Sequence, residues 1–382
     1  MVIKTYQRNS IIAFCFLAVI ALAFTGCSSG EGGTGASMAG ASTGQTEAGT
    51  NPNGTLNLSS KKIGFSVGGS LKSLSNQELD QELADISSLG IKWLRIDIGW
   101  DLVQPVDNGQ YDWTSTDRIV LAARKYNLQL LPVLAYAPEW ARQPACKTNF
   151  VCAPADNAAF ANFAQQVVRR YTPMGVNTWE IWNEPNNNSF WLPQPDAAAY
   201  VELLKATYTA IKQVNPNATV LSGGLSPAEN ISGHIAPRDF LTAMYQDGAR
   251  NYFDALSYHP FSYPVLPDDV TAWSSWSQMS DLDPSIRSIM VANGDGNKQV
   301  WATEYGTPSG GASNLNETLQ ALSFKQALEQ MGNKPWLGAM FFHTYRDSPG
   351  DPNQATNDFG IIRTDGSRKP AYGELQNMLH QQ

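Results

Sequence analysis

The sequence predicts an α/β fold, a single (β/α)8 TIM barrel in which eight parallel strands alternate with helices. Two features indicate it. From about residue 61 onward, short apolar runs alternate with longer amphipathic segments, a pattern typical of βα units that form a parallel sheet. The runs recur at spacings of roughly 30 to 50 residues, and their number and total length match an eight-stranded barrel. The expected strands are 63–67, 93–98, 130–135, 178–182, 219–225, 253–258, 300–304 and 338–344.

Three of the intervening segments carry clear helical signals. The first opens with a capping box at 75–78, in which a Ser and a Glu satisfy each other's backbone donors. The apolar faces of the three helices consist of Leu79, Leu83, Ile86 and Leu89, of Phe160, Phe163, Val167, Val168 and Tyr171, and of Tyr200, Leu203, Leu204, Ile211 and Val214. A doubly wound open sheet is the main alternative, but no Gly-rich phosphate loop follows the first strand.

The composition fits one large domain without a nucleic-acid partner. Of the 382 residues, 42% are hydrophobic and 10% aromatic, which is sufficient for a single core. The formal net charge of −8 is spread thinly, whereas nucleic-acid-binding proteins usually carry a basic stripe. We therefore expect one folded domain at residues 59–382, acting as a monomer.

The first 26 residues have the features of an export signal. Lys4 and Arg8 precede an uninterrupted apolar run at 11–24. This run fits a signal peptide and is shorter than the ~18 apolar residues that a membrane-spanning helix needs. Residues 27–58 are mostly small or polar and show no apolar periodicity, so we expect a flexible tether there.

The end of this signal, Phe24-Thr25-Gly26-Cys27, resembles the lipobox of bacterial lipoproteins, except that Phe24 stands where that motif usually has Leu. The resemblance implies that Cys27 is lipidated and anchors the chain to the cell envelope, with the folded domain periplasmic or extracellular. In a Gram-negative cell, Ser28 after the cysteine would favour the outer membrane. A plain signal peptide is the alternative.

Two cysteines remain outside the leader. Cys146 and Cys152 lie close together in a loop, and an exported chain would preserve a disulfide between them. We expect this bond to staple the loop locally. A metal site is less favoured because no histidine lies nearby.

Two acidic residues stand where predicted strands end. The fourth strand runs into Asn183-Glu184-Pro185, and the seventh ends at Glu304. Catalytic groups of such barrels lie at the carboxyl ends of the strands, so these two carboxylates would face each other across the mouth. Either one alone could cap a helix. A facing pair is what glycoside hydrolysis requires, because one group protonates the leaving oxygen while the other attacks the anomeric carbon or activates water.

These residues resemble the clan A glycoside hydrolases, in which a Glu after Asn on strand four is the acid/base and a Glu on strand seven is the nucleophile of a retaining double displacement. The resemblance extends over residues 61–379 and is closest to family 39 and its branch of bacterial exopolysaccharide hydrolases. It implies that Glu184 is the acid/base, that Glu304 is the nucleophile and that Asn183 hydrogen-bonds the sugar 2-OH. Further matching segments are 93–95, 137–140, 258–260 and 365–372.

The two glutamates need opposite protonation states. Glu184 must hold a proton, aided by burial and by the negative charge of Glu304. Glu304 must be ionised, and we expect its partner to be Arg95 at the end of strand two, because a close guanidinium favours a carboxylate. A structural salt bridge under the barrel mouth is the alternative for Arg95.

Several other residues are candidates for contact with the sugar. His259 ends strand six, where the clan often places a sugar-contacting His, and Tyr263 would hydrogen-bond the nucleophile, although the clan spacing of this pair is tighter. Tyr258 is the alternative to Tyr263, but strand alternation turns it away from His259. His343 ends strand eight, where the clan often has Trp; it either lines the site or is a core histidine.

Aromatic side chains would form the sugar-stacking platforms, and Trp140 and Trp191 are the best candidates because they follow strands three and four. Most aromatic residues of a barrel are simply core. We expect no cofactor and no metal, since the four histidines are scattered. The acidic loop after strand eight is more simply solvated than a Ca²⁺ site. This loop contains Asp347, Asp351, Asn353 and Asp358.

The favoured interpretation is a retaining glycosidase that cleaves O-glycosidic bonds in an extracellular or cell-surface polysaccharide, joined to the membrane only through its lipid anchor. A non-catalytic glycan-binding lipoprotein on the same barrel is the main alternative. A structural or adhesion lipoprotein is the third. The fold alone does not identify a sugar.

Overall fold

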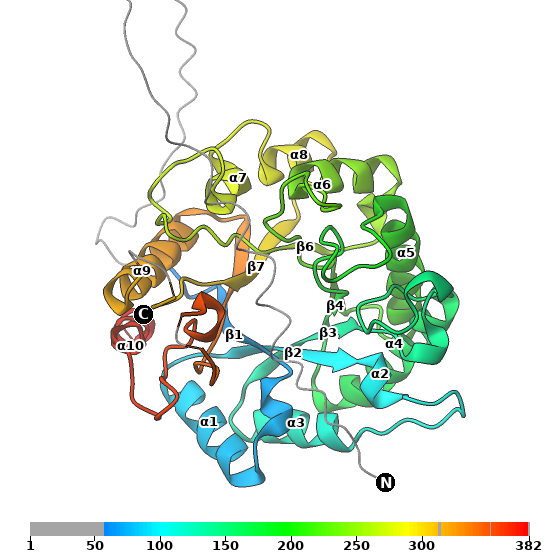
Figure 1. The fold of residues 1–382 in the computed structure, drawn as a ribbon, viewed down its shortest axis with the longest axis horizontal. Coiled ribbons are helices and arrows are strands. Elements are labelled where there is room, and N and C mark those ends of the chain that lie inside the picture. The colour runs from blue at the N-terminus through cyan, green and yellow to red at the C-terminus, as the bar shows by residue number, and fades with distance from the viewer. Residues whose placement is uncertain (1–56, 312–314, 352, 381–382) are drawn as a thin grey trace, which may run out of the picture.

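A computed structural model describes residues 57–311, 315–351 and 353–380. Eight strands form one closed barrel in sequence order, and every neighbouring pair is parallel, including β1 with β8 (Figure 1). The predicted (β/α)8 barrel is therefore confirmed. The strands are β1 (Lys62–Gly68), β2 (Trp93–Gly99), β3 (Gln129–Ala135), β4 (Thr178–Ile181), β5 (Thr219–Leu221), β6 (Ala255–Tyr258), β7 (Gln299–Tyr305) and β8 (Leu337–Phe342).

Helices surround the barrel on its outer face (Figure 1). The α-helices are α1 (Asn76–Ser88), α2 (Trp100–Val103), α3 (Thr114–Lys125), α4 (Asn157–Tyr171), α5 (Ala197–Val214), α6 (Pro237–Gln246), α7 (Ser275–Ser280), α8 (Ile286–Ala292), α9 (Glu317–Asn333) and α10 (Pro370–His380). The capping box that the sequence predicts is present, since Ser75 accepts from the Glu78 backbone and Glu78 from that of Ser75. Among these helices, none is long and apolar enough to cross a membrane.

Three strands end earlier than the sequence predicts, and one of them, β8, stops at Phe342 instead of residue 344. β4 stops at Ile181 because Trp182 adopts a left-handed backbone with φ 72°. β5 stops at Leu221, and only isolated bridges follow it, from Gly224 to Asn183 and from Leu225 to Tyr258. These irregular ends lie at the carboxyl side of the barrel, where the chain must turn side chains inward.

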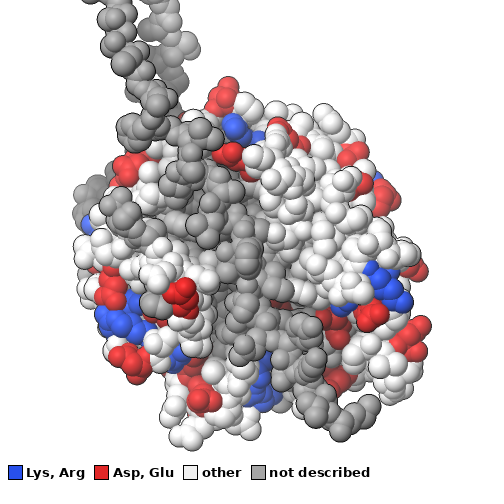
Figure 2. Space-filling model, viewed as in Figure 1, with Lys and Arg blue, Asp and Glu red and all other residues white. Residues whose placement is uncertain are grey.

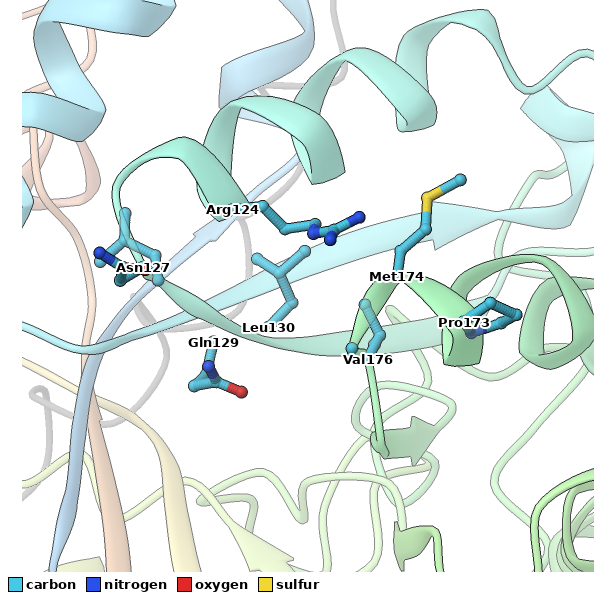
Figure 3. Close-up of a pocket in the computed structure, with 9 residues that line it drawn as sticks. Arg124, Asn127, Gln129, Leu130, Pro173, Met174 and Val176 are labelled. Carbon is cyan, nitrogen blue, oxygen red and sulfur yellow. The ribbon is translucent and has the colours of Figure 1, made fainter.

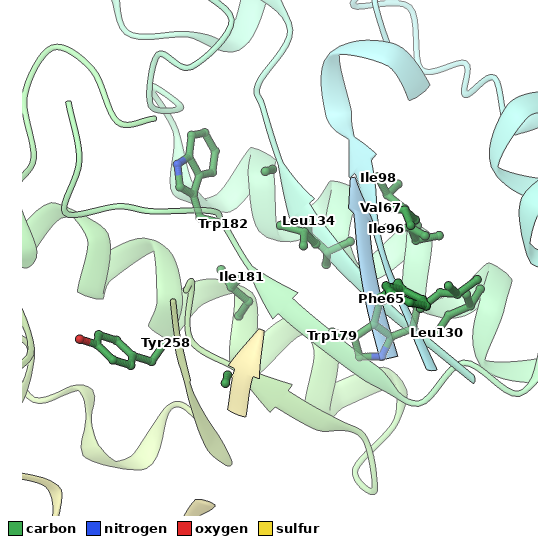
Figure 4. Packing of buried hydrophobic residues seen from close by; sticks show 14 of the residues in the cluster. Phe65, Val67, Ile96, Ile98, Leu130, Leu134, Trp179, Ile181, Trp182 and Tyr258 are labelled. Atoms are coloured by element: carbon green, nitrogen blue, oxygen red, sulfur yellow. The ribbon is translucent and has the colours of Figure 1, made fainter. Parts of the chain in front are cut away.

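The barrel interior is closed at its amino-terminal end by an apolar layer, which separates that end from the polar side chains above it. The layer consists of Leu131, Leu221, Ala255, Trp301, Ala339 and Phe341, with Trp93 packed against it. A larger core fills the space between strands and helices (Figure 4), and Phe65, Ile96 and Trp179 are among its buried members. The predicted apolar face of α4 is entirely buried in it.

The surface carries charges of both signs. Figure 2 shows Lys and Arg interspersed with Asp and Glu around the visible face, without a large field of one sign.

Cys146 and Cys152 form a disulfide in the loop after β3, with their Cα atoms 5.5 Å apart. The predicted signal peptide, the lipidation site Cys27 and all but the last residues of the predicted tether lie outside the described residues.

The loop after β8 is organised by a buried ion pair. Lys369 Nζ lies 2.8 Å from Asp347 Oδ1, and the same oxygen accepts a hydrogen bond from the Gly360 backbone. Both side chains are at most 7% exposed. The neighbouring Asp351 accepts from the Asn353 backbone. Asp347 thus already faces an ammonium group, which takes the place that a bound cation would have beside it.

Lys369→Met should lower the free energy of unfolding by about 3–5 kcal/mol, because it leaves a buried carboxylate without its partner. The matched control is Lys325→Met, which removes an exposed ion pair with Glu329 and should cost at most about 1 kcal/mol. Urea denaturation of both variants measures the difference. Equal costs would show that the buried pair does not hold this loop.

Candidate active site

Three functional groups converge at the carboxyl end of the barrel. One carboxylate oxygen of Glu184, one of Glu304 and one ring nitrogen of His259 all lie within 4.8 Å of one another. Glu184 follows β4, His259 follows β6 and Glu304 belongs to β7. The structure therefore brings together the two glutamates that the sequence singled out.

The backbone around Glu184 is unusual and firmly held. Trp182 and Glu184 both have positive φ, at 72° and 46°, a conformation that costs a non-glycine residue of order 1–3 kcal/mol. The Glu184 N–H donates to Gly224 O, and the Glu184 carbonyl accepts from the Asn187 N–H, both at 3.0 Å. These bonds hold a turn that aims the carboxylate into the barrel mouth.

Glu304 is aimed inward by an irregularity in its strand. The pairing of β7 with β8 shifts register between Ala302 and Tyr305, and such shifts re-aim side chains at barrel rims. The Glu304 carboxylate then accepts from Arg95 Nη1 at 2.5 Å and from Ser66 Oγ at 3.4 Å. Its side chain is 17% exposed, so the carboxylate is nearly buried yet still reaches solvent.

We expected Arg95 at the end of β2, but it is the third residue of that strand. Its long side chain runs up the interior and meets two carboxylates. Besides Glu304, it donates from Nε and Nη2 to Glu180 at 2.7 and 3.0 Å. Both proposed roles therefore apply, since Arg95 is a partner of Glu304 and also part of a buried salt bridge.

Charges around Glu304 favour its ionised form. Burial by itself raises the pKa of Glu304, but His259, Arg95 and His343 outweigh it and bring the pKa from 4.5 down to about 2. Burial acts in the opposite direction on the guanidinium and lowers the pKa of Arg95, but the charges of Glu180 and Glu304 outweigh burial and raise that pKa overall. The guanidinium and the Glu304 carboxylate thus stabilise each other's charge.

Glu184 has a different environment. Its Oε1 lies 2.9 Å from His259 Nδ1, and its Oε2 accepts from Asn187 Nδ2 at 3.0 Å. Asn183, the residue before it, accepts from Arg95 Nη2 at 2.8 Å. Glu184 is therefore in contact with an imidazole and an amide, whereas Glu304 contacts a permanent cation.

The imidazole of His259 is completely buried and fits against a glycine. A Cβ at position 224 would come within 2.1 Å of His259 Nε2. Only glycine leaves room there for the ring. Nε2 lies 3.1 Å from Thr303 Oγ1, which fixes the ring at both nitrogens.

His343 lines the site and is not a core histidine. Its Nδ1 lies 3.9 Å from Glu304 Oε2, and its side chain is 15% exposed. Burial lowers the pKa of His343, against the opposing charge of Glu304. The rings of Phe261 and Phe359 pack edge-on against it.

The two tyrosines near His259 differ in direction. Tyr258 points outward, as strand alternation predicts, and donates to Ser275 O at 3.0 Å. Tyr263 packs its ring edge-on against Phe359, with 5.6 Å between centroids. Its predicted hydrogen bond to the nucleophile stays a prediction.

One of the two predicted tryptophan platforms is wrong, and the other stays a prediction. Trp191 is 2% exposed and packs edge-on against Trp182 and Tyr200, so it belongs to the core and cannot stack on a sugar. Trp140 is half-buried, packs against Trp100 and donates from Nε1 to Gln104 O. Proximity to the carboxyl end of a strand does not distinguish a platform from a core residue, because the loops bury aromatic rings of their own.

Five residues of the site were not singled out from the sequence. Glu180 carried a recognisable signal, since an acidic residue inside an apolar strand must find a buried partner. The others had none, because serine, threonine, asparagine and glycine are common in strands and loops alike. The five residues are Ser66, Glu180, Asn187, Gly224 and Thr303.

Among the described residues, the cluster of Glu184, His259 and Glu304 has the donor types that can hold a metal ion. The permanent charge of Arg95, 2.5 Å from Glu304, opposes a cation at that position. Two carboxyl groups beside an imidazole, one of them held ionised by Arg95, fit the cluster better. A separate surface depression lies at the opposite end of the barrel, where β3 and β4 begin (Figure 3), lined by residues that include Arg124 and Met174.

Known proteins share this architecture. A structure of a family 39 glycoside hydrolase from the gut symbiont Bacteroides cellulosilyticus WH2 superimposes with a TM-score of 0.65 and 24% identity, over 83% of this chain and 63% of that one. A monomeric beta-xylosidase from Caulobacter crescentus CB15 gives 0.63 and 20%, over 83% and 67%. Xylanase 10B from Thermotoga petrophila RKU-1, in complex with xylobiose, gives 0.58 and 16%, over 84% and 94%.

At these sequence identities, the similarity to the solved structures establishes the fold alone. This chain spans about two thirds of the length of the first two enzymes. The predicted membership of clan A is confirmed by a family model. The model described as Cellulase (glycosyl hydrolase family 5) matches residues 57–338, whereas family 39 enzymes are among the structures that share the fold. The chain therefore belongs to the cellulase family, glycosyl hydrolase family 5.

Proposed function

We propose that the protein is a retaining glycoside hydrolase that cleaves O-glycosidic bonds of an extracellular or cell-surface polysaccharide. The observation that carries this is the short gap between carboxylate oxygens of Glu184 and Glu304, within 4.8 Å. Retaining enzymes hold their two carboxyl groups about 5–5.5 Å apart, whereas inverting enzymes need about 6.5–9.5 Å to admit a water. An oxygen-to-oxygen gap of at most 4.8 Å lies below the range of inverting enzymes, which supports direct attack by Glu304.

In the first step, the Glu304 carboxylate attacks the anomeric carbon while the glycosidic oxygen leaves with the proton of Glu184. A covalent glycosyl ester forms on Glu304. In the second step, Glu184 removes a proton from water, the water oxygen attacks the same carbon and Glu304 leaves as a carboxylate. Two inversions at one carbon retain its configuration.

The surrounding charges suit this cycle. Arg95 stabilises Glu304 before attack, and the ester that forms carries no charge. Glu180 remains bound to Arg95 throughout, so the buried guanidinium is never left without a counterion. Asn183 directs its oxygen to Arg95, which leaves its amide N–H groups to donate to a sugar hydroxyl.

We also propose that the chain is exported and anchored through lipid on Cys27, with residues 27–58 as a tether and the barrel periplasmic or extracellular. Support comes from the sequence, since the apolar run at 11–24 is followed by a lipobox-like motif. The alternative activity is glycan binding without cleavage.

Glu184→Gln and Glu304→Gln should each reduce turnover by about 10³-fold or more, because the first removes a proton donor and the second a nucleophile. Both variants should still fold and show a cooperative unfolding transition. The exposed Glu139, changed to Gln, is the matched control and should retain activity. Hydrolysis of a broad glycan panel measures turnover, and NMR of the first product anomer tests retention. Normal activity in either site variant would overturn the assignment. Binding of glycans by the wild type without any turnover would favour a binding protein.

The low pKa of Glu304 predicts a pH-dependent contribution to stability. A carboxylate whose folded pKa is about 2, instead of 4.5, contributes in full above pH about 4.5 and loses that contribution as the pH falls toward 2. The free energy of unfolding should therefore fall more between pH 5 and pH 3 in the wild type than in Glu304→Gln. Urea denaturation at several pH values measures this. Parallel falls in both proteins would contradict it.

Cys27→Ser should abolish lipid incorporation and move the protein from the membrane fraction to the soluble exported fraction. Cys15→Ser is the matched control, since it changes a cysteine inside the apolar run of the signal and should leave lipidation intact. Metabolic labelling with an alkyne fatty acid in a bacterial host provides the measurement. Unlabelled wild-type protein would favour a plain signal peptide.

A further inference from the structure

A continuous chain of hydrogen bonds connects Glu180, deep in the barrel, with Glu184 at its mouth. Glu180 Oε1 is 3.0 Å from Ser257 Oγ, which contacts Thr303 Oγ1. Thr303 Oγ1 is 3.1 Å from His259 Nε2, and His259 Nδ1 is 2.9 Å from Glu184 Oε1. The four residues from Glu180 to His259 are fully buried, so their polar atoms must find hydrogen-bond partners inside the protein.

The direction of the chain is set at Glu180. Its carboxylate faces Arg95, which stays protonated at any accessible pH, and also accepts from the Gly224 backbone N–H at 3.0 Å. An ionised carboxylate can only accept hydrogen bonds. Ser257 must therefore donate its one hydroxyl hydrogen to Glu180.

Each following group is then left with one role. A hydroxyl has a single hydrogen, so Ser257 Oγ can only accept from Thr303. The Thr303 hydrogen is used in that bond, and its oxygen can only accept from His259 Nε2. If Thr303 instead donated to His259 Nε2, Ser257 would have to donate to Thr303. A lone pair of Ser257 Oγ would then face the Glu180 carboxylate, in a buried site where that repulsion is strong.

We propose that this one-way chain fixes a proton on His259 Nε2 and thereby makes Glu184 and His259 share one proton across their 2.9 Å contact. The proton resides on Glu184 as a carboxylic acid, or on Nδ1 of an imidazolium that faces a carboxylate. Loss of this proton would leave the Nδ1 lone pair against a carboxylate oxygen, a repulsive contact that the shared proton removes. Ser257 and Thr303 are positioning residues, which act on Glu184 through His259.

The consequence for catalysis rests on the proposed function, because it concerns Glu184 as the proton donor to the leaving oxygen. The tautomer of His259 does not depend on that function. Other charges also act on the pair. Negative Glu304 favours retention of the proton and Arg95 opposes it. Further titratable groups around the site include Asp97 on β2, His343 after β8 and His234 on the loop before α6.

Nitrogen-15 NMR of the histidine side chains tests the tautomer directly in the full chain, which contains four histidines. The His259 signals are assigned by their absence from His259→Asn. Nε2 of His259 should carry a proton throughout the pH range of the folded protein. A neutral ring with its proton on Nδ1 would overturn the proposal, whether or not any glycan is cleaved.

Thr303→Val removes the acceptor for Nε2 with little change in shape, and Thr303→Ser is the matched control that keeps the hydroxyl. In the valine variant the ring proton should move to Nδ1 and donate to the Glu184 carboxylate. Since a hydrogen bond to the charged form favours it, the basic limb of the pH–rate profile should shift to lower pH by about one unit. The serine variant should keep the wild-type limb.

The outcomes separate the two proposals. If Thr303→Val is active and its basic limb is unchanged, the role of the hydrogen-bond chain is overturned while the proposed function stands. A protonated Nε2 in a protein that cleaves no glycan would support the chain and overturn the proposed function. If Thr303→Val does not fold, the wild-type NMR measurement alone decides the tautomer.

Discussion

The arrangement of the barrel mouth depends on one buried guanidinium shared by two carboxylates. Arg95 cannot lose its proton, and burial of an isolated charge is too costly to tolerate. Glu180 satisfies it from one side with two hydrogen bonds, and Glu304 from the other with one. Because these residues come from β2, β4 and β7, the electrostatic requirement also fixes how those strands sit around the interior.

This sharing makes the two glutamates at the mouth chemically unequal. Glu304 lies against a permanent cation, and its pKa is low although burial acts in the opposite direction. Glu184 lies against a histidine and an asparagine, groups without a permanent charge. Two carboxylates of the same kind are thus placed in two different environments, as the proposed roles of acid and nucleophile require.

Close backbone approach is the second constraint. The ends of β4 and β5 come so near to His259 that a side chain at Gly224 would overlap the imidazole. The backbone of Gly224 in turn donates to Glu180 and accepts from Glu184. One residue without a side chain therefore connects the Glu180 carboxylate, the Glu184 backbone and the imidazole of His259.

The sequence by itself determined the eight strands, the helical faces of α1, α4 and α5, and the location of Glu184 and Glu304, because hydrophobic periodicity and the strand-end rule are local. It placed Arg95 too near the strand end and assigned Trp191 to the surface, since neither the reach of a side chain nor its packing can be derived from spacing. Glu180, Ser66 and Thr303 entered the site only through tertiary contacts between strands far apart in the chain. Periodicity tells which face of a strand is inward, but the identity of the groups that meet there, and hence their charge and proton sharing, is decided only when the barrel closes.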